Sequence, residues 1–151
     1  MTSLKMKGFS NLFLTSSLCT LVTSAAVPVR LMALNSTMTI ESMQRTCDYT
    51  DTLCHWSFVI AVDGARTECA YDITMSGTTG ARYSANAGVQ CGCFTVTSNW
   101  SGQFGPNDGF ITLSIVDYPQ GTIAWPAYRD DQLDSGHAVA PDQSYPVQII
   151  P

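Results

Sequence analysis

The sequence predicts a single all-β domain, an antiparallel β-sandwich or small β-barrel stapled by two disulfides, following a cleaved signal peptide. Three observations support this prediction: segments in which apolar and polar residues alternate, turn residues between them about every 8–12 positions, and several cysteines. No segment has the apolar period of an amphipathic helix, and 151 residues is a usual length for one domain.

The first 26 residues show the three parts of a secretory signal peptide. Lys5 and Lys7 give a positive start, residues 12–26 are apolar to small, and two alanines close the segment. The apolar part is too short and too rich in Ser and Thr to span a bilayer as a helix. The alternative interpretation is a buried N-terminal helix. A signal peptide at 1–26 predicts a secreted, extracellular protein with no membrane span.

Removal of this leader makes the chain more acidic. Both lysines lie in the leader, so the remainder holds five arginines against all twelve acidic residues, a formal net charge of −7. Binding to a phosphate backbone needs clustered Lys and Arg, so the composition argues against a nucleic-acid partner.

Five cysteines remain after the leader, and in a secreted chain they indicate a disulfide framework with one cysteine left over. They are Cys47, Cys54, Cys69, Cys91 and Cys93. The C-x6-C and C-x-C spacings, with only two histidines in the chain, fit zinc poorly. The sequence therefore predicts neither a metal site nor another cofactor.

Residues 27–46 have no clear period, and we expect a poorly structured N-terminal arm there. The β domain is predicted at 47–151. Residues 54–62 alternate, with Cys54, Trp56 and Phe58 on one face, and an Asp-Gly turn connects them to a return strand at 67–73.

Further strands are predicted from Val89, from Phe110, from Thr122 and at the C-terminal end. Around the C-x-C motif the apolar phase changes, and a β-bulge at Gly92 would keep Cys91 inside and turn Cys93 to the other face. In the segment that contains Pro126, which is predicted to be an edge strand, Trp125 is expected to face inward.

Loop aromatics provide the candidate binding surface, namely Trp100, Phe104, Tyr128 and Tyr145. Exposed Trp and Tyr are common anchors in binding surfaces. The alternative for Trp100 is that it folds back over the end of the barrel. Two Asn-x-Ser/Thr sequons, at Asn35 and Asn99, are candidate N-glycosylation sites.

No catalytic constellation is evident, so no catalytic residue is predicted. Ser135 and His137 lack the Gly-x-Ser-x-Gly context of a hydrolase nucleophile. The alternative of a small acid hydrolase rests on loop and strand-end aspartates whose separation the sequence does not reveal. These are Asp117, Asp130, Asp131, Asp134 and Asp142.

The runs "CHWSFVI", "TECAYDI", "TVTSNWSGQFGPNDGF" and "WPAY" resemble small secreted cysteine-containing proteins of filamentous ascomycete fungi, some described as hypersensitive-response-inducing elicitors. The resemblance covers residues 47–151, and the architecture is distantly similar to the β-barrel of the major Alternaria allergen. It implies a non-enzymatic effector in the plant apoplast, with a host extracellular or cell-surface protein as partner. A glycan- or cell-wall-binding module that uses Trp100 is the alternative.

The cysteines usual in these proteins correspond to Cys47, Cys54, Cys69 and Cys91 of this sequence. Among the pairings that five cysteines allow, we predict Cys47–Cys54 and Cys69–Cys91. Cys93 departs from the pattern, and we expect it to be a free thiol.

Overall fold

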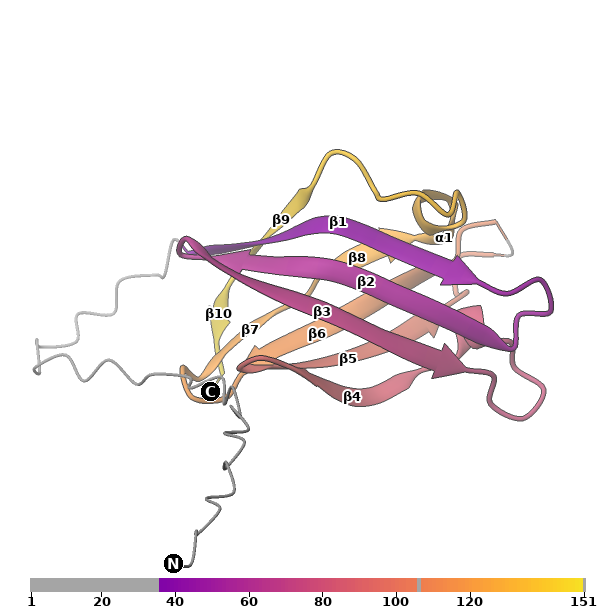
Figure 1. The fold of residues 1–151 in the computed structure, drawn as a ribbon, viewed down its shortest axis with the longest axis horizontal. Helices are drawn as coiled ribbons and strands as arrows, with labels where there is room; N and C mark the ends of the chain where they lie inside the picture. The colour runs from indigo at the N-terminus through magenta and orange to yellow at the C-terminus, as the bar shows by residue number, and fades with distance from the viewer. Residues whose placement is uncertain (1–35, 106, 151) are drawn as a thin grey trace, which may run out of the picture.

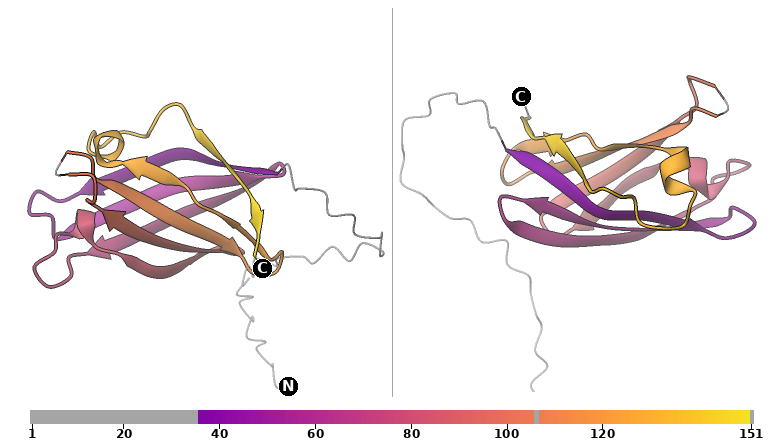
Figure 2. Two further views of the ribbon diagram at one scale, coloured as in Figure 1. Left: turned by 180° about the vertical axis from the view of Figure 1, so that it is seen from behind. Right: turned by 90° about the horizontal axis from the view of Figure 1, so that it is seen from above.

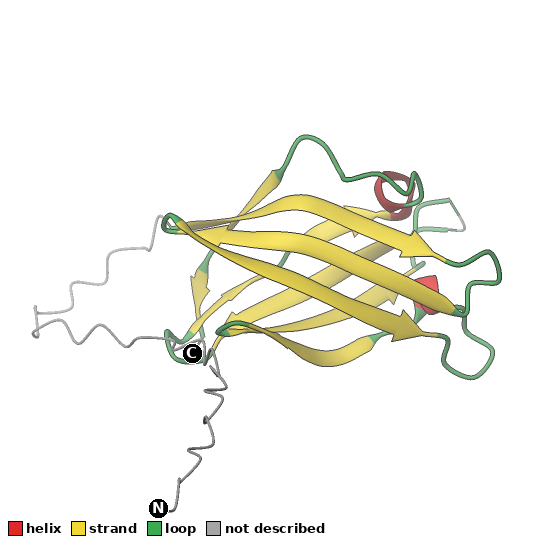
Figure 3. Cartoon of the chain, viewed as in Figure 1, coloured by secondary structure: helices red, strands yellow, loops and turns green. Residues whose placement is uncertain are grey.

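Almost every element of this protein is a β-strand (Figure 3). The computed structural model describes residues 36–105 and 107–150, so the predicted signal peptide and the first part of the predicted arm lie outside the described residues. In chain order the elements are β1 (Thr37–Cys47), β2 (Leu53–Val62), β3 (Ala65–Thr74), the 3-10 turn η1 (Ala81–Tyr83), β4 (Asn86–Cys91), β5 (Phe94–Ser101), β6 (Phe110–Asp117), β7 (Thr122–Ala124), β8 (Ala127–Arg129), α1 (Asp130–Leu133), β9 (Gln143–Pro146) and β10 (Gln148–Ile149).

Two antiparallel sheets lie face to face, which confirms the predicted fold class (Figures 1 and 2). The first sheet has the order β3-β2-β1-β9, and the second has the order β10-β7-β6-β5-β4, with β8 also paired to β6. The C-terminal segment crosses between them, since β9 pairs with β1 and β10 pairs with β7. On the opposite side, a disulfide joins Cys69 of β3 to Cys91 of β4.

The core lies between the sheets and is built from the inward positions of each strand. Trp56, Phe58 and Ile60 come from β2 of the first sheet, and Ile111 and Leu113 come from β6 of the second; all five are buried. Because successive side chains of a strand face opposite sides, every second residue of each strand faces the core, and one face of each sheet is buried.

Strand β1 overturns the prediction of an unstructured arm for its part of the chain. It pairs with β2 on one side and β9 on the other, so it is a central strand of the first sheet. The register shifts between Glu41 and Gln44, where Ser42 has a φ of 53°, and this bulge lets both Ile40 and Met43 point inward. A bulge and a buried arginine at position 45 hide the period of two that identifies a strand in a sequence.

The predicted Asp-Gly hairpin is present between β2 and β3. Val62 pairs with Ala65, so Asp63 and Gly64 form a two-residue loop, with φ values of 50° and 81°. Positive φ at both positions is the requirement of a type I′ turn, which is why Asp-Gly is favoured there.

The C-x-C segment forms a second hairpin, so the predicted bulge at Gly92 is wrong. Cys91 pairs with Phe94 across the turn, and Gly92 takes a φ of 58° at the first turn position, as a type II′ turn requires. Cys91 and Phe94 are both buried, as expected, because directly paired residues face the same side. The change of apolar phase marks a reversal of the chain rather than an extra residue in one strand.

The inward position predicted for Trp125 is also wrong. Its neighbours Ala124 and Pro126 are buried, and Trp125 itself is 50% exposed. The backbone N–H of Leu113 donates to the carbonyl of Pro126 at 2.7 Å, so the strand continues past the proline with the opposite parity to the one expected.

Both predicted disulfides, Cys47–Cys54 and Cys69–Cys91, are present. The expectation of a free thiol at Cys93 is wrong, because Cys93 is disulfide-bonded and no described cysteine is free. The residue at the apex of the β4–β5 turn is therefore part of the covalent framework.

Because Tyr71 of β3 is buried, we expect the free energy of unfolding to fall at alkaline pH. Burial raises the pKa of Tyr71 to about 12, against weaker opposing effects of Ser98 and Asn86, whereas the unfolded value is about 10. The folded state therefore holds the phenol proton more tightly in this interval. Stability is unchanged below pH 10 and falls by about 1.4 kcal/mol per pH unit above it for this one group.

Urea denaturation at several pH values from about 9 to 11 measures this slope. The stability of Tyr71→Phe should fall less steeply with pH, but it should still fall, because burial of Tyr128 also raises the pKa of its phenol. Equal slopes for the two proteins would show that Tyr71 ionisation does not limit alkaline stability.

Candidate interaction surface

One end of the molecule gathers the longer connections, and we call it the loop end. It consists of residues 48–52, 75–85, 102–105, 107–109 and α1, and it lies at the right of Figure 1. Large apolar side chains are exposed there: Tyr49 fully, Phe104 at 68% and Tyr83 at 41%. Exposed aromatics on loops that are held by a rigid scaffold are typical of binding surfaces.

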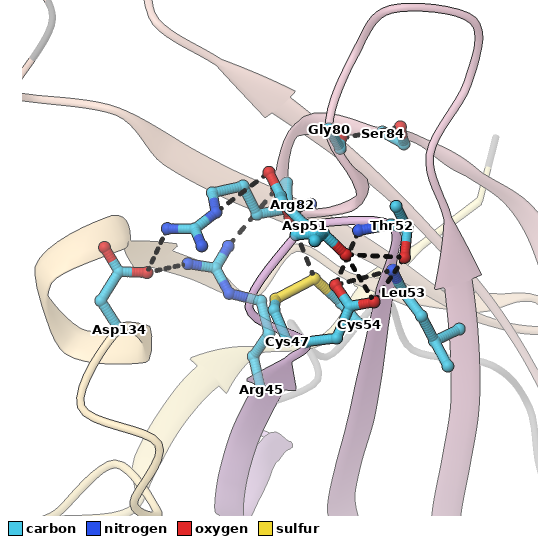
Figure 4. The surroundings of a disulfide bond; sticks show 12 residues. Arg45, Cys47, Asp51, Thr52, Leu53, Cys54, Gly80, Arg82, Ser84 and Asp134 are labelled. Atoms are coloured by element: carbon cyan, nitrogen blue, oxygen red, sulfur yellow. Dashed lines mark hydrogen bonds and ion pairs between the residues drawn. A yellow bond between two sulfur atoms is a disulfide. The ribbon is translucent and has the colours of Figure 1, made fainter.

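A buried arginine ties the loop end to the core (Figure 4). The side chain of Arg45, at an inward position of β1, is only 1% exposed and lies with its guanidinium 5.6 Å from the centre of the Trp56 ring. It pairs with Asp134, and with Asp130 at 3.5 Å. A buried charge requires such partners, so Arg45 fixes α1 against the first sheet.

The disulfide-closed loop between β1 and β2 is joined to η1. The backbone N–H of Ala81 donates to the Asp51 carbonyl at 2.7 Å, and the N–H of Arg82 donates to the Asp51 carboxylate at 2.9 Å. The Arg82 guanidinium lies 3.2 Å from the same carboxylate. Burial lowers the pKa of Arg82, but Asp51 and Asp134 outweigh it, so that pKa lies above its ordinary value.

Trp100 is held in place rather than freely exposed. Its indole N–H donates to the Asp130 carboxylate at 2.8 Å, and its ring meets that of Tyr83 edge-on at 4.6 Å. Gly102 passes so close to the indole that a Cβ atom on it would clash with the ring, and a Cβ atom on Gly109 would clash with the Asp130 carboxylate that the indole binds. The ring is half-buried, which agrees with the alternative that Trp100 folds back over the end of the barrel.

Phe104 lies at the mouth of an open pocket of about 290 Å³ at the rim of the loop end. The pocket is lined by Phe104, Asp108, Phe110 and Arg129. The two phenyl rings stack with centres 5.7 Å apart, and Asp131 holds the Arg129 guanidinium at 3.0 Å. An apolar floor beside fixed polar groups is the usual composition of a small-ligand site.

Tyr128 of β8 and Tyr145 of β9 form a separate aromatic pair. Tyr128 is 1% exposed, and its ring centre is 6.2 Å from that of the half-buried Tyr145, whose hydroxyl donates to the Ala127 carbonyl at 3.0 Å. The structure therefore brings Trp100 and Phe104 to the loop end, whereas Tyr128 is buried on the far side of Ile111, the residue that pairs with both Trp100 and Tyr128. Their predicted role in binding stays a prediction.

Asn99 is exposed on strand β5, and Asn35 lies outside the described residues. The amide of Asn99 points away from the core, since Ser98 beside it is buried. Its use as a glycan acceptor remains a prediction.

The aspartates considered for a hydrolase each contact a neighbouring group. Asp117 accepts from the Gln120 N–H at 3.1 Å, and Asp142 accepts from the Ser42 N–H at 2.8 Å. Asp130 and Asp134 both pair with Arg45. Among the described residues, one group has ligand atoms close enough to share a metal ion, Cys47, Asp51 and Cys54, and its two sulfurs are bonded to each other.

Replacing Trp100 with phenylalanine should lower the free energy of unfolding by about 1–2 kcal/mol, because Asp130 loses a hydrogen-bond donor inside a partly buried network. Trp125→Phe is the matched control, because Trp125 is 50% exposed and its indole bonds to no described residue, and its effect should stay below about 0.5 kcal/mol. Chemical denaturation of both variants measures the difference. Equal stabilities would mean that the indole bond to Asp130 contributes nothing.

Sequence reasoning missed Arg45, Tyr49 and Tyr83 as residues of this end. Arg45 carried no signal, because a charged residue in a strand is normally assigned to the outer face. Tyr49 and Tyr83 sit beside turn residues, which identifies them as loop residues but not as neighbours in space.

Among the described residues, no helix is long and apolar enough to cross a membrane.

Comparison with known proteins gives two findings. A family model described as Effector TSP1 matches residues 39–150, from within β1 to the end of the described chain. A curated protein named Effector TSP1, from Hypocrea virens (strain Gv29-8 / FGSC 10586), is 38% identical over 122 residues, which cover 80% of this chain and 82% of that protein.

Proposed function

We propose that this chain, which belongs to the Effector TSP1 family, is a secreted fungal effector that acts in the plant apoplast through its surface and elicits host defence or cell death without a catalytic step. The observation that carries the proposal is the loop end. There, an exposed tyrosine sits on a loop that a disulfide closes and that Asp51 anchors to η1. A rigid, exposed aromatic costs little entropy when a partner binds it.

Several features support an extracellular role. Two disulfides persist in oxidising compartments, and the acidic composition argues against a nucleic-acid target. The partner expected from this surface is a host extracellular or cell-surface protein. A non-enzymatic mode of action is supported by the aspartates, which hold arginines and backbone amides instead of facing each other across a cleft.

Infiltration of the purified secreted protein into leaves tests the proposal. We expect cell death or induction of defence genes at about micromolar concentration, and loss of the response after reduction and alkylation. Tyr49→Ser should weaken the response. Tyr118→Ser makes the same change at an exposed tyrosine in the β6–β7 turn, at the other end of the molecule, and should not weaken it. No response from the parent protein would refute the elicitor function. Equal responses from both variants would remove Tyr49 from the recognition surface.

A further inference from the structure

The outer face of the second sheet is rich in hydroxyl and amide side chains. The outward positions of β5 and β6 alternate with buried ones, and their register pairs Thr97 with Ser114, and Asn99 with Thr112. The polar residues that β5 and β6 contribute to this face are Thr95, Thr97, Asn99, Ser101, Thr112 and Ser114.

This face carries almost no charge, although the chain is acidic. Among the outward positions of β5, β6 and β8 there is no carboxylate, and Arg129 at one end is the single cation. The outer face of the first sheet is different, since Glu41, Glu68 and Asp72 lie there. A ligand that meets the second sheet therefore encounters hydrogen-bonding groups without a local field of like charge.

Aromatic rings border the hydroxyl rows. The register that pairs Ile115 with Ala124 and Thr112 with Ala127 places Trp125 opposite Ser114, and its ring is 50% exposed. Four residues farther along β6, Phe110 pairs with both Ser101 and Arg129 and stacks on Phe104. Four residues of strand span about 13 Å, so two apolar platforms lie at the ends of a hydroxylated strip.

We propose that this face binds a neutral oligosaccharide or polysaccharide, with sugar rings packed on Trp125 and on the Phe104–Phe110 pair. A sugar ring has apolar C–H faces and a hydroxylated edge; the faces match aromatic rings, and the hydroxyls match groups that both donate and accept. A spacing of about 13 Å between platforms suits a chain of several sugars rather than one. Protein interfaces are depleted in serine, which disfavours a second protein as the occupant.

The site meets the loop-end surface assigned above to host recognition only at Phe104, because Trp125 and the hydroxyl rows lie on the sheet and not on Tyr49 or η1. The sequon at Asn99 lies within the strip, so a glycan attached there would cover it. The binding experiment therefore uses protein exported to an oxidising compartment of an expression host that attaches no N-glycans, so that Asn99 keeps its unmodified amide.

Pull-down on insoluble chitin, β-glucan and cellulose tests the proposal. We expect binding to at least one polymer, with little change when salt is raised severalfold, because no ion pair contributes. Trp125→Ala should weaken binding roughly tenfold. Thr112→Glu, which keeps both aromatic platforms and adds a charge at the centre of the strip, should weaken it similarly. Tyr118→Ala and Trp100→Phe are controls that should bind like the parent.

Thermal unfolding confirms that each variant is folded before its binding is compared. Absence of binding to all three polymers, or full binding by folded Trp125→Ala and Thr112→Glu, would overturn the proposal. So would concentration-dependent dimerisation that both variants abolish, since a second copy of the chain would then occupy the face. The leaf response does not enter this test, so the glycan site and the elicitor function can fail separately.

Discussion

Replacing Arg45 with alanine should lower the free energy of unfolding by about 3 kcal/mol, which corresponds to a fall in Tm of roughly 10 °C for a domain of this size. The side chain is almost fully buried, and its removal leaves the Asp130 carboxylate, whose side chain is 20% exposed, without its cation. It also leaves a void beside the Trp56 ring. Asp134 is about half exposed and can be rehydrated, so the cost stays at the lower end for a broken buried pair.

Two variants separate charge from packing in this experiment. Arg66→Ala is the matched control, because Arg66 pairs with Glu41 but is 63% exposed, and its loss should cost less than about 1 kcal/mol. Arg45→Met keeps most of the volume over Trp56 and removes only the charge, so it should fall between the other two. If Arg45→Ala is no less stable than Arg66→Ala, the ion pairs in Figure 4 do not hold the loop end.

The regular part of the fold was predictable because its signals are local. In β2 and β3 the buried apolar side chains recur at every second position, and Asp63–Gly64 meets the backbone requirement of the turn between them. Irregular features removed this signal elsewhere. The bulge at Ser42 shifts the phase of β1, and the hairpin at Gly92 reverses the chain where a single strand was expected.

The candidate surface was predictable as residue types but not as an arrangement. Whether Trp100 is free depends on Asp130, which lies 30 positions away in the sequence, and on the path of Gly102 and Gly109. The exposure of Trp125 depends on the register between β6 and the segment around Pro126. Such contacts are set by long-range packing, which a local pattern does not contain.

Removing the disulfide between Cys69 and Cys91, by changing both residues to alanine, should cost about 3 kcal/mol. The two cysteines are 22 positions apart and join the edges of the two sheets, where β3 and β4 are neighbours but belong to different sheets. The bond therefore restricts a large loop in the unfolded chain, and it also closes a side of the fold that no backbone ladder between the described strands closes.

The Cys47–Cys54 pair provides the comparison, and its removal should cost about 2 kcal/mol. It spans 7 positions, and its two residues already face each other in the β1–β2 ladder. The two double variants should also differ in hydrogen exchange, with faster exchange of β4 amides only when Cys69 and Cys91 are replaced, since β4 then keeps β5 as its only strand partner among the described residues. A larger loss for Cys47–Cys54, or exchange in β4 that stays slow, would mean that packing between the sheets rather than the disulfide closes this side of the molecule.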